Sequence, residues 1–120
     1  MVVYDVNDDS FFKQQVKIDN EIFFIMLEYI GDSWYFSVLY SDNKTYAIRV
    51  RAVPNIEYSK QFNRFNMATI NKQVVNLKGS FMIVKFDGGS EIKQDDFINK
   101  RSALVYMTEG ELNAILAKSN

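Results

Sequence analysis

The sequence predicts an all-β fold, a small antiparallel β-barrel or sandwich of about six to seven strands with a short C-terminal helix. Apolar residues make up 48% of the chain and aromatic residues 15%, far more than a disordered chain carries. Apolar runs recur about every ten residues, and turn-forming residues separate them. The length of 120 residues fits one β domain over residues 1–120, with residues 1–10 as an extended N-terminal arm.

The first expected hairpin occupies residues 11–30. Residues 11–18 can extend as a strand, Asp19 and Asn20 supply turn chemistry, and residues 21–30 form a second strand rich in Ile and Phe. Apolar residues in this second strand fall on both parities, which predicts that both of its faces are covered for part of its length. We therefore place it centrally in its sheet.

A second hairpin is expected over residues 34–51. Residues 34–40 alternate between two faces, which predicts a half-buried strand with Trp34 in the core. The turn at 41–43 contains Asp and Asn, which tolerate left-handed backbone conformations. The strand over 44–51 is expected to place three side chains on one face, those of Tyr46, Ile48 and Val50.

The next part of the chain is less regular. Pro54 ends the hairpin, because proline lacks a backbone donor and cannot sit within a paired central strand. No period holds across residues 55–73, which we expect to form an ordered but irregular connection. Strand character returns at 74–86, where a bend at Gly79 leaves a core strand over residues 80–86.

The last strand is expected at residues 102–107, and a short helix should follow it. Thr108 and Glu111 match the capping box, in which a hydroxyl and a carboxylate three residues apart satisfy the first amides of a helix. The apolar stripe that follows is too short for a free helix, so it should pack on its own domain or on a partner. This stripe consists of Leu112, Ile115 and Leu116.

Residues 77–90 hold three of the five glycines and invite comparison with phosphate-binding loops. Those loops need a strand, glycines at fixed spacing and then a helix whose amides face the anion. Here Gly88 and Gly89 precede Ser90 and Glu91, with no Gly-Lys-Ser/Thr sequence and no helix signal. The pattern predicts a turn, because Asp-Gly and Gly-Gly suit positive backbone angles.

The residue inventory excludes most familiar catalytic chemistry. With no Cys and no His, thiol nucleophiles, disulfides, thiolate or imidazole metal sites and Ser-His-Asp triads are absent. The pairs Asp8-Asp9 and Asp95-Asp96 could serve acid–base chemistry or hold a hard cation, but we expect both to be solvated loop charge. We predict no enzyme activity, no cofactor, no metal and no small-molecule substrate.

The sequence also predicts that the chain neither spans a membrane nor carries a classical secretion signal. Its longest apolar run, residues 22–27, has six residues, against the roughly 20 that a membrane-spanning helix needs. Met1 is followed by Val, Val, Tyr and Asp, and no basic region precedes an apolar core.

Positive charge is concentrated in the middle of the chain. Residues 44–78 carry seven basic residues and one acidic residue, although the net charge of the whole chain is −1. Charge segregated in this way suits docking onto an acidic protein surface. The candidate partner-interface residues are Arg49, Arg51, Lys60, Arg64 and Lys72.

Single-stranded nucleic acid is the alternative partner, because a small β-barrel could present these basic residues beside aromatic ones. The aromatic residues in question, which core packing would equally explain, are Tyr46, Tyr58, Phe62 and Phe65. The sequence pI near 5.4 and the lack of a recognisable RNA-binding motif argue against nucleic acid.

Three stretches, taken in order, resemble the baseplate plug proteins of contractile-tailed phages and prophages, of the cyanophage type. They are residues 33–50, with Ser-Trp-Tyr-Phe leading to Tyr-Ala-Ile-Arg-Val; residues 77–89, with Leu-Lys-Gly-Ser-Phe leading to Asp-Gly-Gly; and residues 104–112, Leu-Val-Tyr-Met-Thr-Glu-Gly-Glu-Leu. The weight lies in their order and spacing, and the likeness covers roughly residues 11–112.

The resemblance implies a single all-β domain that serves as a structural virion component. It implies a protein made in the host cytoplasm and placed at the centre of the tail baseplate. There it would contact hub, spike or tube proteins. The resemblance carries over no catalytic residues and no ligand site.

Overall fold

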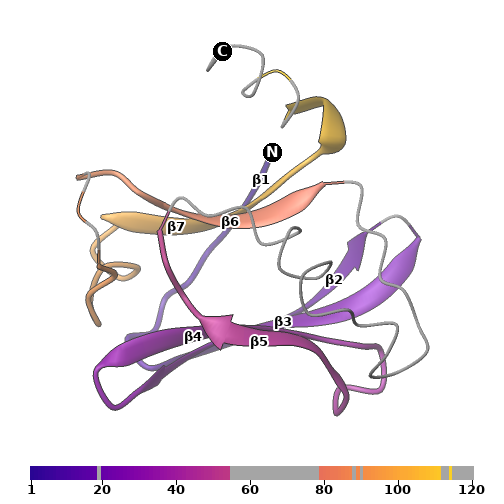
Figure 1. Ribbon diagram of the computed structural model, residues 1–120, viewed down its shortest axis with the longest axis horizontal. Helices are drawn as coiled ribbons and strands as arrows, with labels where there is room; N and C mark the ends of the chain where they lie inside the picture. Colours follow the sequence, from indigo (N-terminus) through magenta and orange to yellow (C-terminus); the bar gives the residue numbers. More distant parts are fainter. Residues whose placement is uncertain (19, 55–78, 88, 90, 112–113, 115–120) are drawn as a thin grey trace.

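The computed structural model describes residues 1–18, 20–54, 79–87, 89, 91–111 and 114. In these residues, seven strands form two antiparallel sheets that face each other (Figure 1). The three-stranded sheet has the order β1-β7-β6 and the four-stranded sheet the order β2-β3-β4-β5. The all-β prediction is confirmed, in the form of two packed sheets. The strands are β1 (Val2–Tyr4), β2 (Phe11–Ile18), β3 (Glu21–Ile30), β4 (Ser33–Leu39), β5 (Tyr46–Arg51), β6 (Ser80–Lys85) and β7 (Ser102–Met107).

The first predicted hairpin, β2 and β3, is confirmed. The two strands pair from Phe11 opposite Glu28 to Ile18 opposite Glu21, and Asn20 in their turn has a φ of 67°. β3 lies between β2 and β4, as expected of a central strand. Met26 is buried although it faces away from the core, so both faces of β3 are covered for part of its length.

The second hairpin, β4 and β5, is also confirmed, and Asp42 shapes its turn. One Asp42 carboxylate oxygen accepts hydrogen bonds from the backbone amides of Lys44 and Thr45, each at 2.9 Å. The Thr45 hydroxyl donates to the other oxygen. These bonds lower the pKa of Asp42 to about 2, and the bond from the Thr45 hydroxyl has the largest effect.

A β-bulge in β5 corrects the predicted pattern of this strand. Val38 pairs with Ile48 whereas Leu39 pairs with Tyr46, so Ala47 is an extra residue in β5. The extra residue reverses the parity, and the Tyr46 side chain lies 38% exposed on the opposite face from Ile48. The prediction that Tyr46 shares a face with Ile48 and Val50 is therefore wrong.

The half-buried character predicted for residues 34–40 is wrong as well. Ser37 and Leu39 point away from the core, yet both are buried. Ser37 lies between Met26 on one neighbouring strand and Arg49 on the other, and such long side chains cover a small residue. Alternation of polar and apolar residues in one strand does not show that side chains of the neighbouring strands bury its outward residues.

The core lies between the two sheets. Trp34 is 1% exposed, as predicted, and its ring meets those of Phe97 and Tyr29 edge-on at centroid distances of 5.2 and 5.4 Å. Its indole N–H donates to the carbonyl oxygen of Lys93 at 3.0 Å. Buried side chains that contribute from both sheets include Ile25, Leu27, Phe36, Phe81, Ile83 and Leu104.

The N-terminal arm is partly a strand. β1 pairs with β7 from Val2 opposite Tyr106 to Tyr4 opposite Leu104, and both Tyr4 and Val6 are buried in the core. The first strand therefore lies beside the last one, a pairing that short local patterns do not indicate. The beginning of the chain is part of the packed domain.

β6 begins after the predicted bend at Gly79 and ends one residue earlier than expected. The inward side chains of β6 are Phe81, Ile83 and Lys85, whereas Phe86 is 67% exposed. The prediction that the core strand extends to residue 86 is therefore wrong. The turn expected after this strand begins at residues 86–87, where Asp87 accepts a hydrogen bond from the Gly89 amide at 3.1 Å.

The capping box at the end of β7 is confirmed. The Thr108 amide donates to Glu111 Oε1 at 3.0 Å, and the Glu111 amide donates to Thr108 Oγ1 at 3.3 Å. Helical residues 109–111 follow. The predicted apolar stripe of Leu112, Ile115 and Leu116 lies outside the described residues, as does the connection expected at 55–73.

Across the described ranges, no helix is long and apolar enough to cross a membrane.

Candidate functional site

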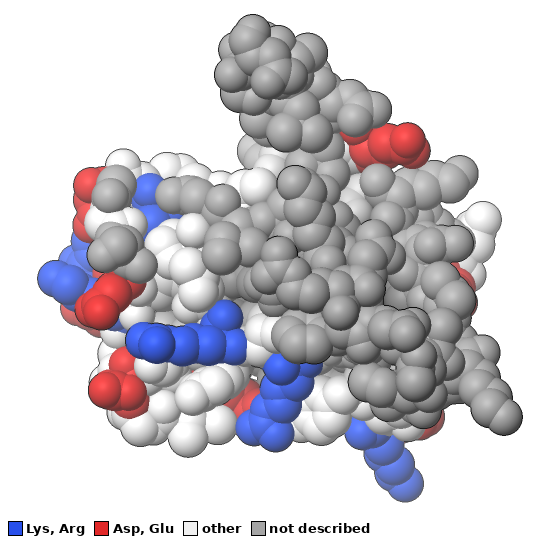
Figure 2. All heavy atoms as spheres, viewed as in Figure 1, with Lys and Arg blue, Asp and Glu red and all other residues white. Residues whose placement is uncertain are grey.

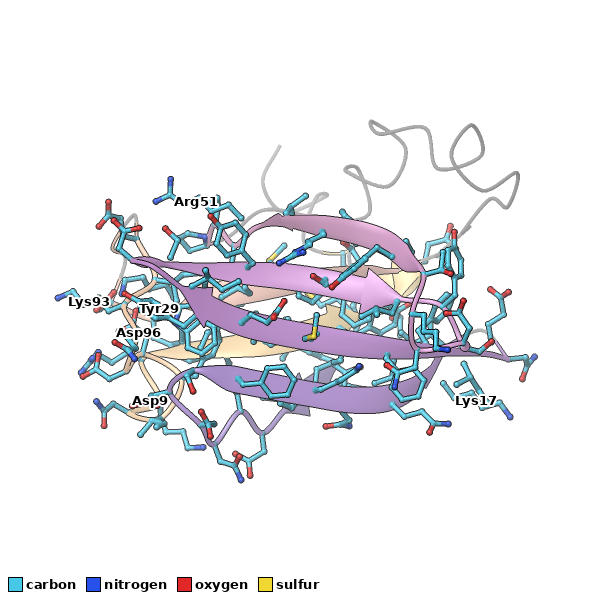
Figure 3. All side chains as sticks on the ribbon, turned by 90° about the horizontal axis from the view of Figure 1, so that it is seen from below. Asp9, Lys17, Tyr29, Arg51, Lys93 and Asp96 are labelled. Atoms are coloured by element: carbon cyan, nitrogen blue, oxygen red, sulfur yellow. The ribbon has the colours of Figure 1, made fainter. Side chains whose placement is uncertain are left out.

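Charged side chains gather at one end of the molecule, at the described residues of the 86–101 connection between β6 and β7. Figure 2 shows acidic and basic groups mixed at this end, and Figure 3 shows Asp96 and Lys93 there, opposite the end that carries Lys17. The connection is held by its own backbone. The Asn99 amide donates to the Asp95 carbonyl at 3.0 Å and the Arg101 amide to the Asp96 carbonyl at 2.9 Å.

Asp96 lies at the centre of this cluster and is fully buried. One carboxylate oxygen accepts hydrogen bonds from Lys85 Nζ at 2.6 Å and from the Lys93 amide at 2.8 Å. The other oxygen accepts from Arg101 Nε at 2.9 Å. Burial alone would raise the pKa of Asp96, but the bonds from Lys85, Lys93 and Arg101 outweigh it and lower that pKa.

The Lys85 ammonium is buried as well. Its hydrogen bond to Asp96 raises the pKa of Lys85, and a contact of 3.4 Å with Asp87 adds to the effect. A lysine that acts as a nucleophile needs the opposite shift. The cluster therefore holds the connection onto the domain and keeps Lys85 protonated.

This arrangement corrects the prediction that Asp95 and Asp96 are both solvated loop charge. Asp95 is exposed and pairs with Arg101, but Asp96 is inside the protein. Lys85 explains the difference, because it continues the inward face of β6 and needs a counter-charge where it leaves the apolar core. The equivalent prediction for Asp8 and Asp9 is confirmed: both residues are exposed.

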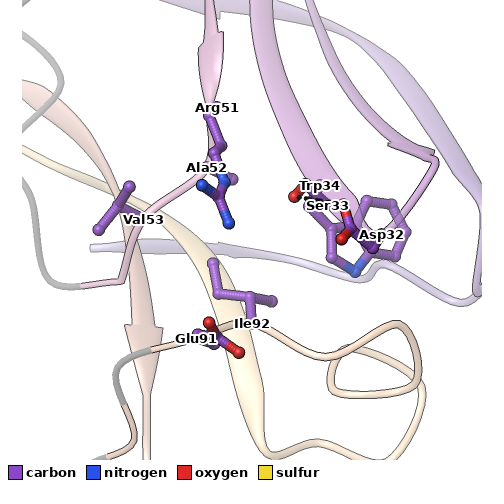
Figure 4. A pocket seen from close by; sticks show the side chains of 8 residues that line it. All are labelled: Asp32, Ser33, Trp34, Arg51, Ala52, Val53, Glu91 and Ile92. Carbon is purple, nitrogen blue, oxygen red and sulfur yellow. Dashed lines mark hydrogen bonds between the residues drawn. The ribbon is translucent and has the colours of Figure 1, made fainter.

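A polar recess of about 440 Å³ lies close to this cluster, between the β4–β5 hairpin and the connection (Figure 4). Arg51 stands on one side of it, and the carboxylates of Asp32 and Glu91 stand on the others. The remaining lining residues are Ser33, Trp34, Ala52, Val53 and Ile92. Within the described part of the chain, no group of three or more acidic side chains is placed to hold a metal ion.

The second candidate site is the side of the four-stranded sheet that faces away from the core, seen toward the viewer in Figure 3. We call it the outer face. The cross-strand pairs place sixteen side chains on this side of the sheet. They are Phe11, Lys13, Gln15 and Lys17 of β2; Ile22, Phe24, Met26, Glu28 and Ile30 of β3; Ser33, Tyr35, Ser37 and Leu39 of β4; and Tyr46, Arg49 and Arg51 of β5.

Two of the predicted interface residues, Arg49 and Arg51, lie on the outer face. Arg49 stands over the Tyr46 ring, 5.3 Å from its centroid, and 3.8 Å from the Glu28 carboxylate. Arg51 is exposed where the outer face meets the polar recess. The other three predicted residues, Lys60, Arg64 and Lys72, lie outside the described residues.

The outer face also contains basic residues that the sequence reasoning missed. Lys13 lies 5.7 Å from the centroid of the Phe24 ring, and Lys17 is exposed further along β2. Both belong to residues 1–43, which carry eight acidic residues and two basic ones, so a count of charge by segment hides them. The sequence could have shown that Lys13 and Lys17 share a face, because they are four residues apart in one strand and alternate residues of a strand point to the same side.

No protein-family model matches this sequence, and no curated protein matches it.

Proposed function

We propose that the chain is a non-enzymatic structural protein of a phage or prophage tail baseplate, where it serves as a central plug that contacts hub, spike or tube proteins. The order and spacing of residues 33–50, 77–89 and 104–112 carry the proposal. In support, their described parts coincide with paired elements: the β4–β5 hairpin, β6 with its turn, and β7 with its capped helical residues.

The packing of these elements suits such a role. Strands β6 and β7 pair with each other and share one core with β4, so the three stretches belong to one body. The buried Lys85–Asp96 pair fastens the long connection onto that body. In the proposed mechanism, one rigid domain fills the axial region of the tail and holds hub and spike in place until contraction displaces them.

Co-assembly with tail proteins tests the proposal. The chain would be co-expressed with the hub, spike and tube proteins encoded by neighbouring genes, then purified by a tag on the chain and examined by size exclusion and negative-stain microscopy. We expect a stoichiometric complex with at least one of them. A chain whose gene lies away from tail genes, and which elutes alone in every combination, would contradict the proposal.

A second candidate is a small β protein that binds single-stranded nucleic acid, favoured by the basic side chains and exposed Tyr46 of the outer face. Fluorescence anisotropy with labelled oligo(dT) tests it. Micromolar binding that weakens steeply between 50 and 200 mM salt, as counterion release at roughly 6–10 phosphate contacts requires, would favour this candidate over the structural one.

A further inference from the structure

The charge of the outer face differs from that of the chain. Among the described residues it carries four basic side chains, Lys13, Lys17, Arg49 and Arg51, and one acidic side chain, Glu28. Glu28 lies 3.8 Å from Arg49, so its charge is already offset within the face. The face is therefore cationic on a chain whose net charge is −1, and its electrostatic complement is an acidic surface.

The outer face is also unusually apolar for a sheet surface in contact with water. Phe11, Ile22, Ile30 and Tyr46 are exposed by 48, 41, 47 and 38% of their surface. A solvated antiparallel sheet normally shows polar residues on its outer side. Aromatic and arginine side chains are typical of interface centres, so the composition of the outer face suits a docking surface.

A second copy of the chain is a poor occupant for this face. A twofold interface brings the same patch of both copies together, so four basic side chains would meet four others. Like charges brought together in an interface oppose association. The partner is therefore a different surface that carries the opposite charge.

The geometry of the rings argues against nucleic acid. Bases bind to a sheet by stacking on free aromatic faces. Here Lys13 lies over the Phe24 ring and Arg49 over the Tyr46 ring, so each ring already has a cation on one face. A carboxylate can pair with both cations where they stand, whereas a base that stacks on the cation-bearing face of either ring would have to displace the cation.

From these observations we infer that the outer face of β2–β5 docks an acidic protein surface whose carboxylates pair with Lys13, Arg49 and Arg51 and whose apolar side chains cover Ile22 and Tyr46. The inference deepens the proposed function, on which it rests for the identity of the partner as a tail protein. It adds which side of the domain makes the contact and what chemistry the partner presents.

The test uses the full chain and a random Glu–Tyr copolymer as a probe that carries both acidic and aromatic groups. Binding is measured by fluorescence anisotropy, with oligo(dT) as the competing polyanion. The test variant is Arg49→Glu with Arg51→Glu. The control variant, Lys93→Glu with Lys100→Glu, changes the net charge equally on exposed residues of the 86–101 connection.

We expect the test variant to bind the copolymer at least tenfold more weakly than the unaltered chain and the control variant to bind within about twofold of it. Methyl spectra of labelled isoleucines give a readout that does not depend on a variant. Ile22 and Ile30 signals should shift on addition of the copolymer, and the signal of buried Ile25 should stay in place.

Three results would overturn the inference: equal loss in both variants, shifts that leave Ile22 and Ile30 unaffected, or tighter binding of oligo(dT) than of the copolymer. The third result would assign the face to nucleic acid.

Circular dichroism and the melting temperature establish that each variant is folded. If the test variant unfolds, Lys13→Glu with Lys17→Glu takes its place on the other edge of the same face. Failure here with a tail complex still formed would leave the proposed function standing.

Discussion

At the scale of single residues, the buried carboxylate of Asp96 makes the contacts that join β6 to the connection after it. The Asp96 carboxylate accepts three hydrogen bonds, from Lys85 Nζ, the Lys93 amide and Arg101 Nε. Each of its oxygens faces a donor, so no neutral isostere can replace it without placing a donor against a donor. The residue thereby joins the end of β6 to the connection that leads into β7.

We predict that Asp96→Asn lowers the free energy of unfolding by about 3 kcal/mol, because it leaves the buried Lys85 ammonium with only the exposed Asp87 carboxylate, 3.4 Å away, as a counter-charge. Urea denaturation followed by circular dichroism measures the loss. Asp95→Asn is the matched control and should cost less than about 1 kcal/mol, since its pair with Arg101 is exposed. Equal losses in the two variants would mean that the buried pair contributes no more to the free energy of unfolding than the exposed pair does.

The same residue predicts a dependence on pH. The folded-state pKa of Asp96 lies below its ordinary value of 3.8, so its stabilising contribution is present above pH 3.8 and is lost as the pH falls through the folded-state pKa. The difference in unfolding free energy between the unaltered chain and Asp96→Asn should therefore narrow below pH 3.8. Denaturation curves at pH 7, 4 and 2.5 measure it, and a constant difference would contradict the assignment.

At the scale of elements, the backbone of β7 lies so close to Gly79, just before β6, that no side chain fits there. A Cβ atom at Gly79 would lie 2.1 Å from the Met107 carbonyl oxygen and 2.6 Å from the Tyr106 hydroxyl. A backbone oxygen in a paired strand cannot move aside as a flexible side chain can. The bend predicted at Gly79 thus reflects contact with β7 as well as a local turn preference.

Gly79→Ala and Gly110→Ala form a matched pair for this element. We expect Gly79→Ala to destabilise the domain by about 1–3 kcal/mol through overpacking. Gly110 belongs to helical residues 109–111, and a Cβ atom there would meet no neighbouring atom of the described residues within 4 Å, so Gly110→Ala should be neutral or stabilise by up to about 1 kcal/mol. Thermal melts of both variants measure the difference, and a destabilised Gly110→Ala would contradict this geometry.

The elements themselves were largely predictable, because their signals are local. Alternation and turn residues located the β2–β3 and β4–β5 hairpins, and the spacing of Thr108 and Glu111 located the cap. The bulge at Ala47 was missed, since an extra residue in one strand shows only against its partner. β1 was missed for a similar reason, because its three residues become a strand only by pairing with β7.

At the scale of the whole molecule, β1 brings the beginning of the chain into the core. Tyr4 is buried between the sheets, whereas its neighbour Val3 points the other way and is exposed. Burial raises the pKa of Tyr4 from 10.0 to about 12, with a smaller contribution from the electrostatic interaction with nearby Tyr106. The phenol is therefore kept in its neutral form by the packing of the two sheets.

We predict that Tyr4→Ala lowers the free energy of unfolding by about 3 kcal/mol, as for other large aromatic truncations in a core. Val3→Ala, on the opposite side of the same strand, should change it by less than about 0.5 kcal/mol. Urea denaturation of both variants is the measurement. A negligible effect of Tyr4→Ala would mean that residues 1–10 behave as the extended arm that the sequence predicted.

The candidate sites were less predictable than the strands. Arg49 and Arg51 were named from the basic middle of the sequence, and the structure places both on one face. Lys13 and Lys17 reach that face from the acidic first third of the chain, because sheet pairing joins segments that charge counting keeps apart. Asp96 was expected in solvent, and no local pattern could reveal that Lys85 would meet it inside.

Local signals in the sequence were enough to predict the all-β class, the two central hairpins, the turn at Asp42 and the capped end of β7. These features depend on the chemistry of residues that are close in the chain, such as parity, positive backbone angles and side-chain bonds to nearby amides. Four further features became visible only in the folded molecule: the strands form two sheets, β1 lies beside β7, Asp96 is buried, and four basic residues share the outer face. Each of these depends on contacts between distant segments, whose geometry follows from how the two sheets pack.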